Sequence, residues 1–226
     1  MHINYWGYVG DLVMIKCIAF DLWDTLIYLE NGWRTFNILK QEFGISQGVW
    51  KRRVKPIFLC RNQPNEKKLL KDLQEELDLE FDLDRYAKMM FEQRNEDVRN
   101  VKVYSDVRRV IEGLKSLKLD IGVISNQATF YEPCFFDSGF SEFVDFFVFS
   151  NRVGYRKPDP RIYKEFLRLS KADPREVVAV GNNIDQDYRG PMTQGMKALL
   201  LNRSSEPINS QIEVISSLEE LISRVK

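Results

Sequence analysis

The chain has 226 residues and carries 33 Lys and Arg against 33 Asp and Glu, so its formal net charge is zero. A balanced charge argues against a protein that mainly grips nucleic acid or an anionic membrane, and no apolar run approaches the roughly 20 residues that span a bilayer. With 44% hydrophobic and 12% aromatic residues the chain can bury a real core, either as one large domain or as a core with a modest insertion.

The N-terminal 13 residues lack the periodicity of the rest of the chain and have none of the features of a secretory signal. Met14 would make a natural beginning, so we expect it to be the true start and residues 1–13 to be an N-terminal extension. Ile15–Phe20 is typical of a short buried strand that ends at Asp21. From about residue 33 to residue 98 the pattern is helical, with leucines at helical spacing between 69 and 77 and charges on the other face.

After Val101 the pattern alternates between strand and helix. We predict strands at 119–124, within 143–149, at 177–180 and at 197–201, and helices after Ser105, at 129–140, at 159–170 and at 218–225. Ser105 is the expected N-cap of the first of these helices. The alternation predicts an α/β fold, a doubly wound parallel sheet with right-handed crossovers. We expect an α/β catalytic core at 14–26 and 101–226 and an inserted helical cap domain at 27–100.

Histidine and cysteine chemistry is nearly absent. The single histidine, His2, stands at the extreme N-terminus, so we expect no His-based nucleophilic catalysis and no His-rich zinc site. The three cysteines, Cys17, Cys60 and Cys134, are scattered and odd in number, which favours a reducing cytoplasmic location over a disulfide framework. Any catalysis is therefore expected to use carboxylates, hydroxyls, amides and lysine.

Polar side chains follow several of the predicted strands. Asp21 follows IKCIAF, Ser125 and Asn126 follow DIGVI, Lys157 lies in the loop GYRKPDP, and Asp187 comes soon after VVAV. Because ligands bind beyond the carboxyl ends of parallel strands, we expect these groups to converge at one edge of the sheet. A carboxylate beside a lysine and a hydroxyl is the chemistry of a covalent carboxylate nucleophile, with Lys157 keeping Asp21 ionised and Ser125 holding a developing oxyanion.

These segments resemble the four motifs of the haloacid dehalogenase superfamily of hydrolases. FDLWDTL resembles the first motif, VISNQ the second, RKPDPRIY the third and VAVGNNIDQDYRGPMTQGMKALLLN the fourth, in the family's order over roughly residues 15–205. The resemblance implies a Rossmann-like core with a C1 type of cap. It implies Asp21 as nucleophile, Ser125 and Asn126 as groups that orient the substrate, Lys157 as the charge-neutralising lysine and Asp187 as the closing acid.

Two departures from the family pattern bear on the reaction. Trp23 stands where the family's phosphatases carry a second Asp that protonates the leaving oxygen, and losing a positioned general acid costs about 10²- to 10⁴-fold. Asp24 does not replace it, because it occupies a position usually held by Gly or Asp. Asn182 stands where the family has a Mg²⁺-binding acid, so a site made of Asp21, Asn182 and Asp187 is expected to hold Mg²⁺ weakly.

The family's dehalogenases show a similar pattern, because a halide needs no proton to leave. The resemblance implies for them an aromatic residue after the nucleophile, no metal, a tyrosine at the position of Tyr163 and a cap arginine for the substrate carboxylate. The candidates for that arginine are Arg34, Arg52 and Arg53. The substrate-binding set we expect consists of Trp23, Thr25, Tyr163 and Arg53.

Three hypotheses fit these residues. The first is a metal-independent hydrolase of 2-haloacid type, favoured by Trp23 and Asn182. The second is a Mg²⁺-dependent phosphatase that acts on a small phosphate ester or an acyl phosphate, favoured by how common phosphate transfer is in the superfamily. The third is a non-catalytic binding module on the same fold. In each case we expect a small-molecule partner, no nucleic acid and no membrane; the sequence does not indicate an oligomeric state.

Overall fold

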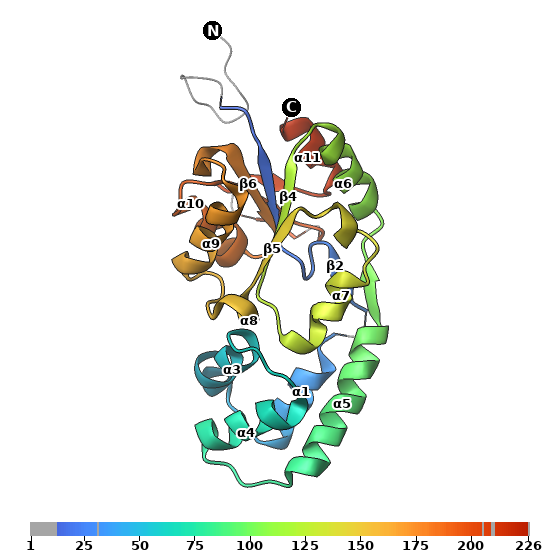
Figure 1. Ribbon diagram of the computed structural model, residues 1–226, viewed down its shortest axis with the longest axis vertical. Helices are drawn as coiled ribbons and strands as arrows, with labels where there is room; N and C mark the ends of the chain where they lie inside the picture. The colour runs from blue at the N-terminus through green and yellow to red at the C-terminus, as the bar shows by residue number, and fades with distance from the viewer. Residues whose placement is uncertain (1–12, 31, 205, 209–210, 226) are drawn as a thin grey trace.

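The computed structural model describes residues 13–30, 32–204, 206–208 and 211–225 (Figure 1). The expected N-terminal extension, apart from Val13, lies outside the described residues. A six-stranded sheet forms the centre of the molecule, in the order β5-β4-β1-β6-β7-β8 with every neighbouring pair parallel. Its strands are β1 (Cys17–Phe20), β4 (Asp120–Ser125), β5 (Phe146–Phe149), β6 (Val177–Gly181), β7 (Lys197–Leu201) and β8 (Val214–Ile215). The predicted parallel α/β class is confirmed.

Both faces of the sheet are covered by helices, as its predominantly apolar strands require. In β1, Ile18 and Phe20 face one buried cluster while Cys17 and Ala19 face the other. The first cluster includes the apolar faces of α6 (Val107–Ser116) and α11 (Glu219–Arg224), and the second that of α9 (Pro160–Ser170). Figure 1 shows α6 and α11 on one side of the sheet and α9 with α10 (Gly190–Met192) on the other.

The connections between the strands contain short helical segments besides these helices. They are η2 (Thr129–Tyr131), α7 (Glu132–Phe136), η3 (Ser141–Phe143), α8 (Ser150–Val153), η4 (Pro174–Glu176) and η5 (Ile184–Arg189). The single helix expected at 129–140 is therefore a 3-10 turn followed by a short α-helix. Ser105 is not the N-cap of α6: the cap residue is Asp106, and its carboxylate binds Arg203 and the backbone N–H of Leu218 instead.

Between β1 and β4, the next strand of this sheet along the chain, the sequence forms a helical segment. An antiparallel pair, β2 (Ile27–Leu29) and β3 (Val101–Val103), joins its two ends to the core. Its helices are α1 (Arg34–Glu42), α2 (Gln47–Val49), η1 (Trp50–Val54), α3 (Lys55–Leu59), α4 (Glu66–Leu77) and α5 (Leu83–Arg99). They enclose an apolar cluster of their own, which includes Leu39, Val54, Leu69 and Met90. We call residues 34–99 the helical insertion; Figure 1 shows it beyond one end of the sheet.

Candidate active site

Asp21 begins the turn that follows β1, and its position is fixed by backbone and side-chain contacts. Its N–H donates to the carbonyl of Val180 in the neighbouring strand β6 at 2.9 Å. Its Oδ2 accepts a hydrogen bond from Thr25 Oγ1 at 3.1 Å, and its Oδ1 lies 2.6 Å from Lys157 Nζ. Asp21 is only 8% exposed, so its carboxylate is aimed at partners within the protein and at one cavity rather than at bulk water.

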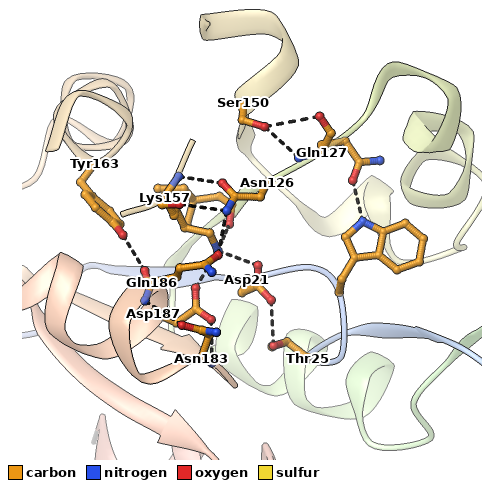
Figure 2. A network of polar contacts seen from close by, with 12 residues as sticks. Asp21, Thr25, Asn126, Gln127, Ser150, Lys157, Tyr163, Asn183, Gln186 and Asp187 are labelled. Atoms are coloured by element: carbon orange, nitrogen blue, oxygen red, sulfur yellow. Dashed lines mark hydrogen bonds and ion pairs between the residues drawn. The ribbon is translucent and has the colours of Figure 1, made fainter. Parts of the chain in front are cut away.

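Lys157 is the centre of the polar network drawn in Figure 2. Its ammonium bridges two carboxylates, since Nζ lies 2.6 Å from Asp21 Oδ1 and 2.6 Å from Asp187 Oδ1. Nζ also donates to the carbonyl oxygen of Ile124 at 2.9 Å, so all three ammonium hydrogens have acceptors. The side chain is 2% exposed, and a charge so buried needs such pairing.

Asp187 reaches this centre from the loop and helical turn after β6. Its Oδ2 accepts the backbone N–H of Asn183 at 2.9 Å, which closes the loop on itself. Gly181, the last residue of β6, leaves room for the carboxylate: a Cβ there would lie 2.5 Å from Asp187 Cγ, closer than real Cβ contacts. The approach of Asp187 to Lys157 therefore depends on glycine at residue 181.

Ser125 and Asn126 lie at the carboxyl end of β4, beside Asp21. Asn126 fixes the lysine loop, because its Oδ1 accepts the Lys157 N–H at 2.7 Å while its Nδ2 donates to the Lys157 carbonyl at 3.1 Å and to Gln186 Oε1 at 2.7 Å. Ser125 differs: its Oγ is buried and has no hydrogen-bond partner among the described residues, yet the residue lines the cavity over Asp21. A buried hydroxyl without a partner is available to a bound substrate.

The charges of this centre perturb one another. Burial raises the pKa of the Asp21 carboxyl to about 7, with Lys157 opposing the rise and Asp187 adding to it. Burial alone would lower the pKa of the Lys157 ammonium, but the adjacent Asp187 and Asp21 outweigh it and hold that pKa above its ordinary value. Lys157 is therefore a permanent cation, and Asp21 is the group whose charge changes near neutral pH.

A cavity of about 380 Å³ opens over Asp21 between the sheet edge and the helical insertion. The core contributes polar side chains: Asp21, Asp24, Ser125, Asn126, Asn182, Asn183, Gln186 and Asp187. Aromatic rings come from Trp33, which directly precedes the helical insertion, and from Phe36, Trp50 and Phe58 within it. The wall on the core side is thus mostly polar, and the facing wall is mostly apolar. Such a combination is typical of a small-molecule site.

The remaining expected residues fall in different places. Trp23 lines the cavity, and its indole N–H donates to Gln127 Oε1 at 2.6 Å. Thr25 is fully buried beneath Asp21 and does not line the cavity. Tyr163 is buried too and bonds the Gln186 carbonyl at 2.6 Å, so it supports the loop of Asp187. Arg53 lies outside the cavity, where its guanidinium bonds Glu76.

Arg53 was therefore a wrong choice of cavity cation, and the other two arginines named with it, Arg34 and Arg52, do not line the cavity either. The cations that do are Lys55, from the helical insertion, and Arg156, from the core loop before Lys157. Sequence reasoning missed both. For Arg156 a signal was present, since it precedes the motif lysine; for Lys55 nothing in the sequence distinguished it from Lys51, Arg52 and Arg53 beside it.

The donor set offers little to a divalent cation as it is arranged. All four oxygens of the two carboxylates already accept hydrogen bonds or ion pairs, from Lys157, Thr25 and the Asn183 N–H. Within the described ranges no group of three or more His, Cys, Asp or Glu side chains could hold a metal ion. Asn182, the third expected ligand, is exposed at the cavity. The residues as arranged therefore fit Mg²⁺ poorly.

Comparison with known proteins identifies the family. The model of the haloacid dehalogenase-like hydrolases matches residues 15–191. Haloacid dehalogenase-like hydrolase domain-containing protein 3 of Mus musculus is 32% identical over 111 residues, covering 49% of this chain and 44% of the relative. Glyceraldehyde 3-phosphate phosphatase of Methanothermobacter thermautotrophicus is 39% identical over 90 residues, covering 39% and 40%. The chain thus spans less than half the length of these curated relatives.

Solved structures agree on the fold. The 2-haloacid dehalogenase of Pseudomonas syringae superposes with a TM-score of 0.67 at 21% identity, covering 94% of this chain and 98% of that one.

In the part of the chain that the structure describes, no helix has both the length and the apolar character needed to cross a membrane. Motif order, site geometry and the family match agree: the chain belongs to the haloacid dehalogenase-like hydrolases.

Proposed function

We propose that this hydrolase acts by nucleophilic attack of Asp21 on a substrate whose leaving group departs without a proton, and that the substrate is a 2-haloacid. The observation that carries the proposal is the surroundings of Trp23. Its indole N–H is committed to Gln127, so the residue at the general-acid position of the family's phosphatases donates no proton into the cavity. A halide leaves as a stable anion and needs none.

The reaction would run in two steps. A carboxylate oxygen of Asp21 attacks the halogen-bearing carbon; the new C–O bond forms as the carbon–halogen bond breaks, and the halide departs with the electron pair. Of the two oxygens, Oδ2 is the freer, since its one hydrogen bond is the 3.1 Å contact with Thr25, whereas Oδ1 is held by Lys157 at 2.6 Å. Water then attacks the ester carbonyl of Asp21, releasing the 2-hydroxy acid, regenerating the carboxylate and giving up one proton.

The neighbouring groups suit these steps. Lys157, whose Nζ lies 2.6 Å from Asp21 Oδ1, would stabilise the ester carbonyl oxygen as it becomes negative during hydrolysis. The Ser125 hydroxyl, unpartnered at the same cavity, would be available as a further donor. Asp187 lines the cavity and shares the Lys157 ammonium with Asp21, and it would take the proton from the attacking water. Asn126 keeps the Lys157 loop in place through its paired bonds to the backbone of that residue.

A phosphatase is the second candidate, favoured by the relative from Methanothermobacter thermautotrophicus, whose name describes phosphate-ester hydrolysis. Asp21 would then form an acyl phosphate, and an acyl phosphate or another substrate with a good leaving group suits a site without a proton donor. In this case Asp21, Asn182 and Asp187 would be the residues nearest to a Mg²⁺ ion. Such activity is expected to be weak and sensitive to chelators.

The test is a comparison of released products. Halide release from 2-chloropropionate and 2-bromopropionate and phosphate release from a phosphoester and acyl phosphate panel are measured with and without EDTA. We expect halide release that EDTA leaves unchanged. Phosphate release abolished by EDTA, without halide release, would replace the first function by the second. Asp21→Asn is expected to abolish either activity, and full activity in that variant would remove the proposed nucleophile.

A further inference from the structure

The cavity is much larger than the smallest 2-haloacids need. Its volume of about 380 Å³ falls in the range of roughly 300–1,000 Å³ that takes drug-sized ligands, and it would hold about a dozen waters. A three-carbon acid would displace only a few of these. Much of the volume is bounded by the rings of Trp33, Phe36, Trp50 and Phe58, which contact one another edge to face or tilted. A wall of this kind binds an apolar or aromatic body.

Two cations face the same space from different parts of the chain. Lys55 is the first residue of α3 in the helical insertion, and Arg156 lies in the core loop between α8 and α9. Within the described part of the chain, neither forms an ion pair with a carboxylate. Both are half-buried, and burial together with the positive charges of Arg156 and Lys51 lowers the pKa of Lys55. The pair therefore places two positive charges without a carboxylate partner on a cavity wall that also carries Asp24.

We infer that the substrate is an organic anion with an aromatic or similarly bulky apolar body, its charged group held between Lys55 and Arg156 and its body packed against Trp33, Phe36, Trp50 and Phe58. This substrate class rests on the proposed function for its reactive carbon, but its recognition does not depend on the reaction. Because the two cations repel each other and stand on the insertion and the core, a bound anion relieves that repulsion and ties the two parts together over Asp21.

Binding tests the inference without turnover. Isothermal titration calorimetry of the intact protein compares 3-phenylpropionate, which has charge and ring, with 3-phenylpropan-1-ol, which lacks the charge, and propionate, which lacks the ring. We expect 3-phenylpropionate to bind at least about tenfold more tightly than either. Lys55→Met should remove most of the affinity difference between 3-phenylpropionate and 3-phenylpropan-1-ol. Lys51→Met, an exposed lysine on the neighbouring turn that does not line the cavity, should change it less than about twofold.

Equal affinity for the three compounds, or equal effects of Lys55→Met and Lys51→Met, would overturn the inference. Thermal unfolding of both variants shows that they fold. Bromide release from 2-bromo-3-phenylpropionate and from 2-bromopropionate distinguishes the proposed dehalogenase function from the proposed substrate class. Selective binding without bromide release supports this substrate class and rejects the dehalogenase function. Bromide release with equal kcat/KM for both acids supports the function and rejects the substrate class.

Discussion

Replacing Lys157 by Met tests the electrostatics of the site most sharply. One oxygen of Asp21 and one of Asp187 each lie 2.6 Å from Lys157 Nζ, so they are no more than twice that distance, 5.2 Å, apart. Two negative charges at that separation repel by about 3 kcal/mol at an effective dielectric constant near 20. Removing the cation from a buried ion pair typically costs about 3–5 kcal/mol. We expect Lys157→Met to lower the free energy of unfolding at pH 8 by about 3–5 kcal/mol.

The loss should depend on pH with a definite sign. Without Lys157, the folded pair of carboxylates retains a proton that unfolded aspartates, with pKa values near 3.9, have released. The folded state then binds more protons than the unfolded state, so stability falls as pH rises, by up to about 1.4 kcal/mol per pH unit for one proton. The wild-type Asp21 also keeps its proton up to about pH 7, so the two proteins should lose stability in parallel below that pH, and the deficit of the variant should widen above it.

Urea unfolding followed by tryptophan fluorescence, in EDTA, measures these differences. The double variant Lys157→Met/Asp187→Asn removes one of the two charges and should recover roughly 2–3 kcal/mol at pH 8. Lys164→Met, an exposed lysine on α9, is the control and should change stability by less than about 0.5 kcal/mol. A Lys157→Met protein as stable as the wild type at pH 8, or a double variant no more stable than the single one, would refute the reasoning.

Three further predictions concern activity. Because burial raises the pKa of Asp21 to about 7 and the attacking group must be ionised, kcat/KM should rise with pH up to about 7 and level off above it; a flat profile from pH 5 to 9 would contradict this. Gly181→Ala places a Cβ 2.5 Å from Asp187 Cγ and should cost about 1–3 kcal/mol of stability together with at least tenfold in kcat; unchanged kinetics would show that Asp187 is not needed there. Thr25→Val removes the hydroxyl bonded to Asp21 Oδ2 and should lower kcat roughly tenfold, with Thr25→Ser restoring it; equal rates in both variants would rule out a role for the hydroxyl.

The convergence of the polar side chains around Asp21 could be predicted from the sequence because it follows from topology. Asp21, Ser125 and Asn126 stand at the ends of β1 and β4, which pair directly, so strand prediction alone brings them together. Lys157 and Asp187 come from loops beyond β5 and β6, the outer neighbours of that pair. Carboxyl ends of parallel strands meet at one edge, and this rule is independent of side-chain packing.

The residues of the helical insertion that line the cavity could not be predicted by this rule. Which of Lys51, Arg52, Arg53 and Lys55 faces Asp21 depends on how the insertion packs on the core, and the π-helical turn η1 rotates these residues away from ordinary α-helical spacing. Arg53, expected to bind substrate, lies outside the cavity and bonds Glu76. The two-residue strand β8 and the short pair β2–β3 were also not predicted, because segments of two or three residues carry no readable alternation.

The central claim is that Asp21 itself attacks the substrate. A single turnover in H₂¹⁸O, with enzyme in excess over a 2-haloacid substrate, tests it directly. Mass spectrometry of the peptide that contains Asp21 should find ¹⁸O in its carboxylate, because water attacks the ester carbonyl of that side chain, while the first product carries ¹⁶O from the protein. Label in the product and none in Asp21 would mean that water attacks the substrate directly, and would contradict the mechanism.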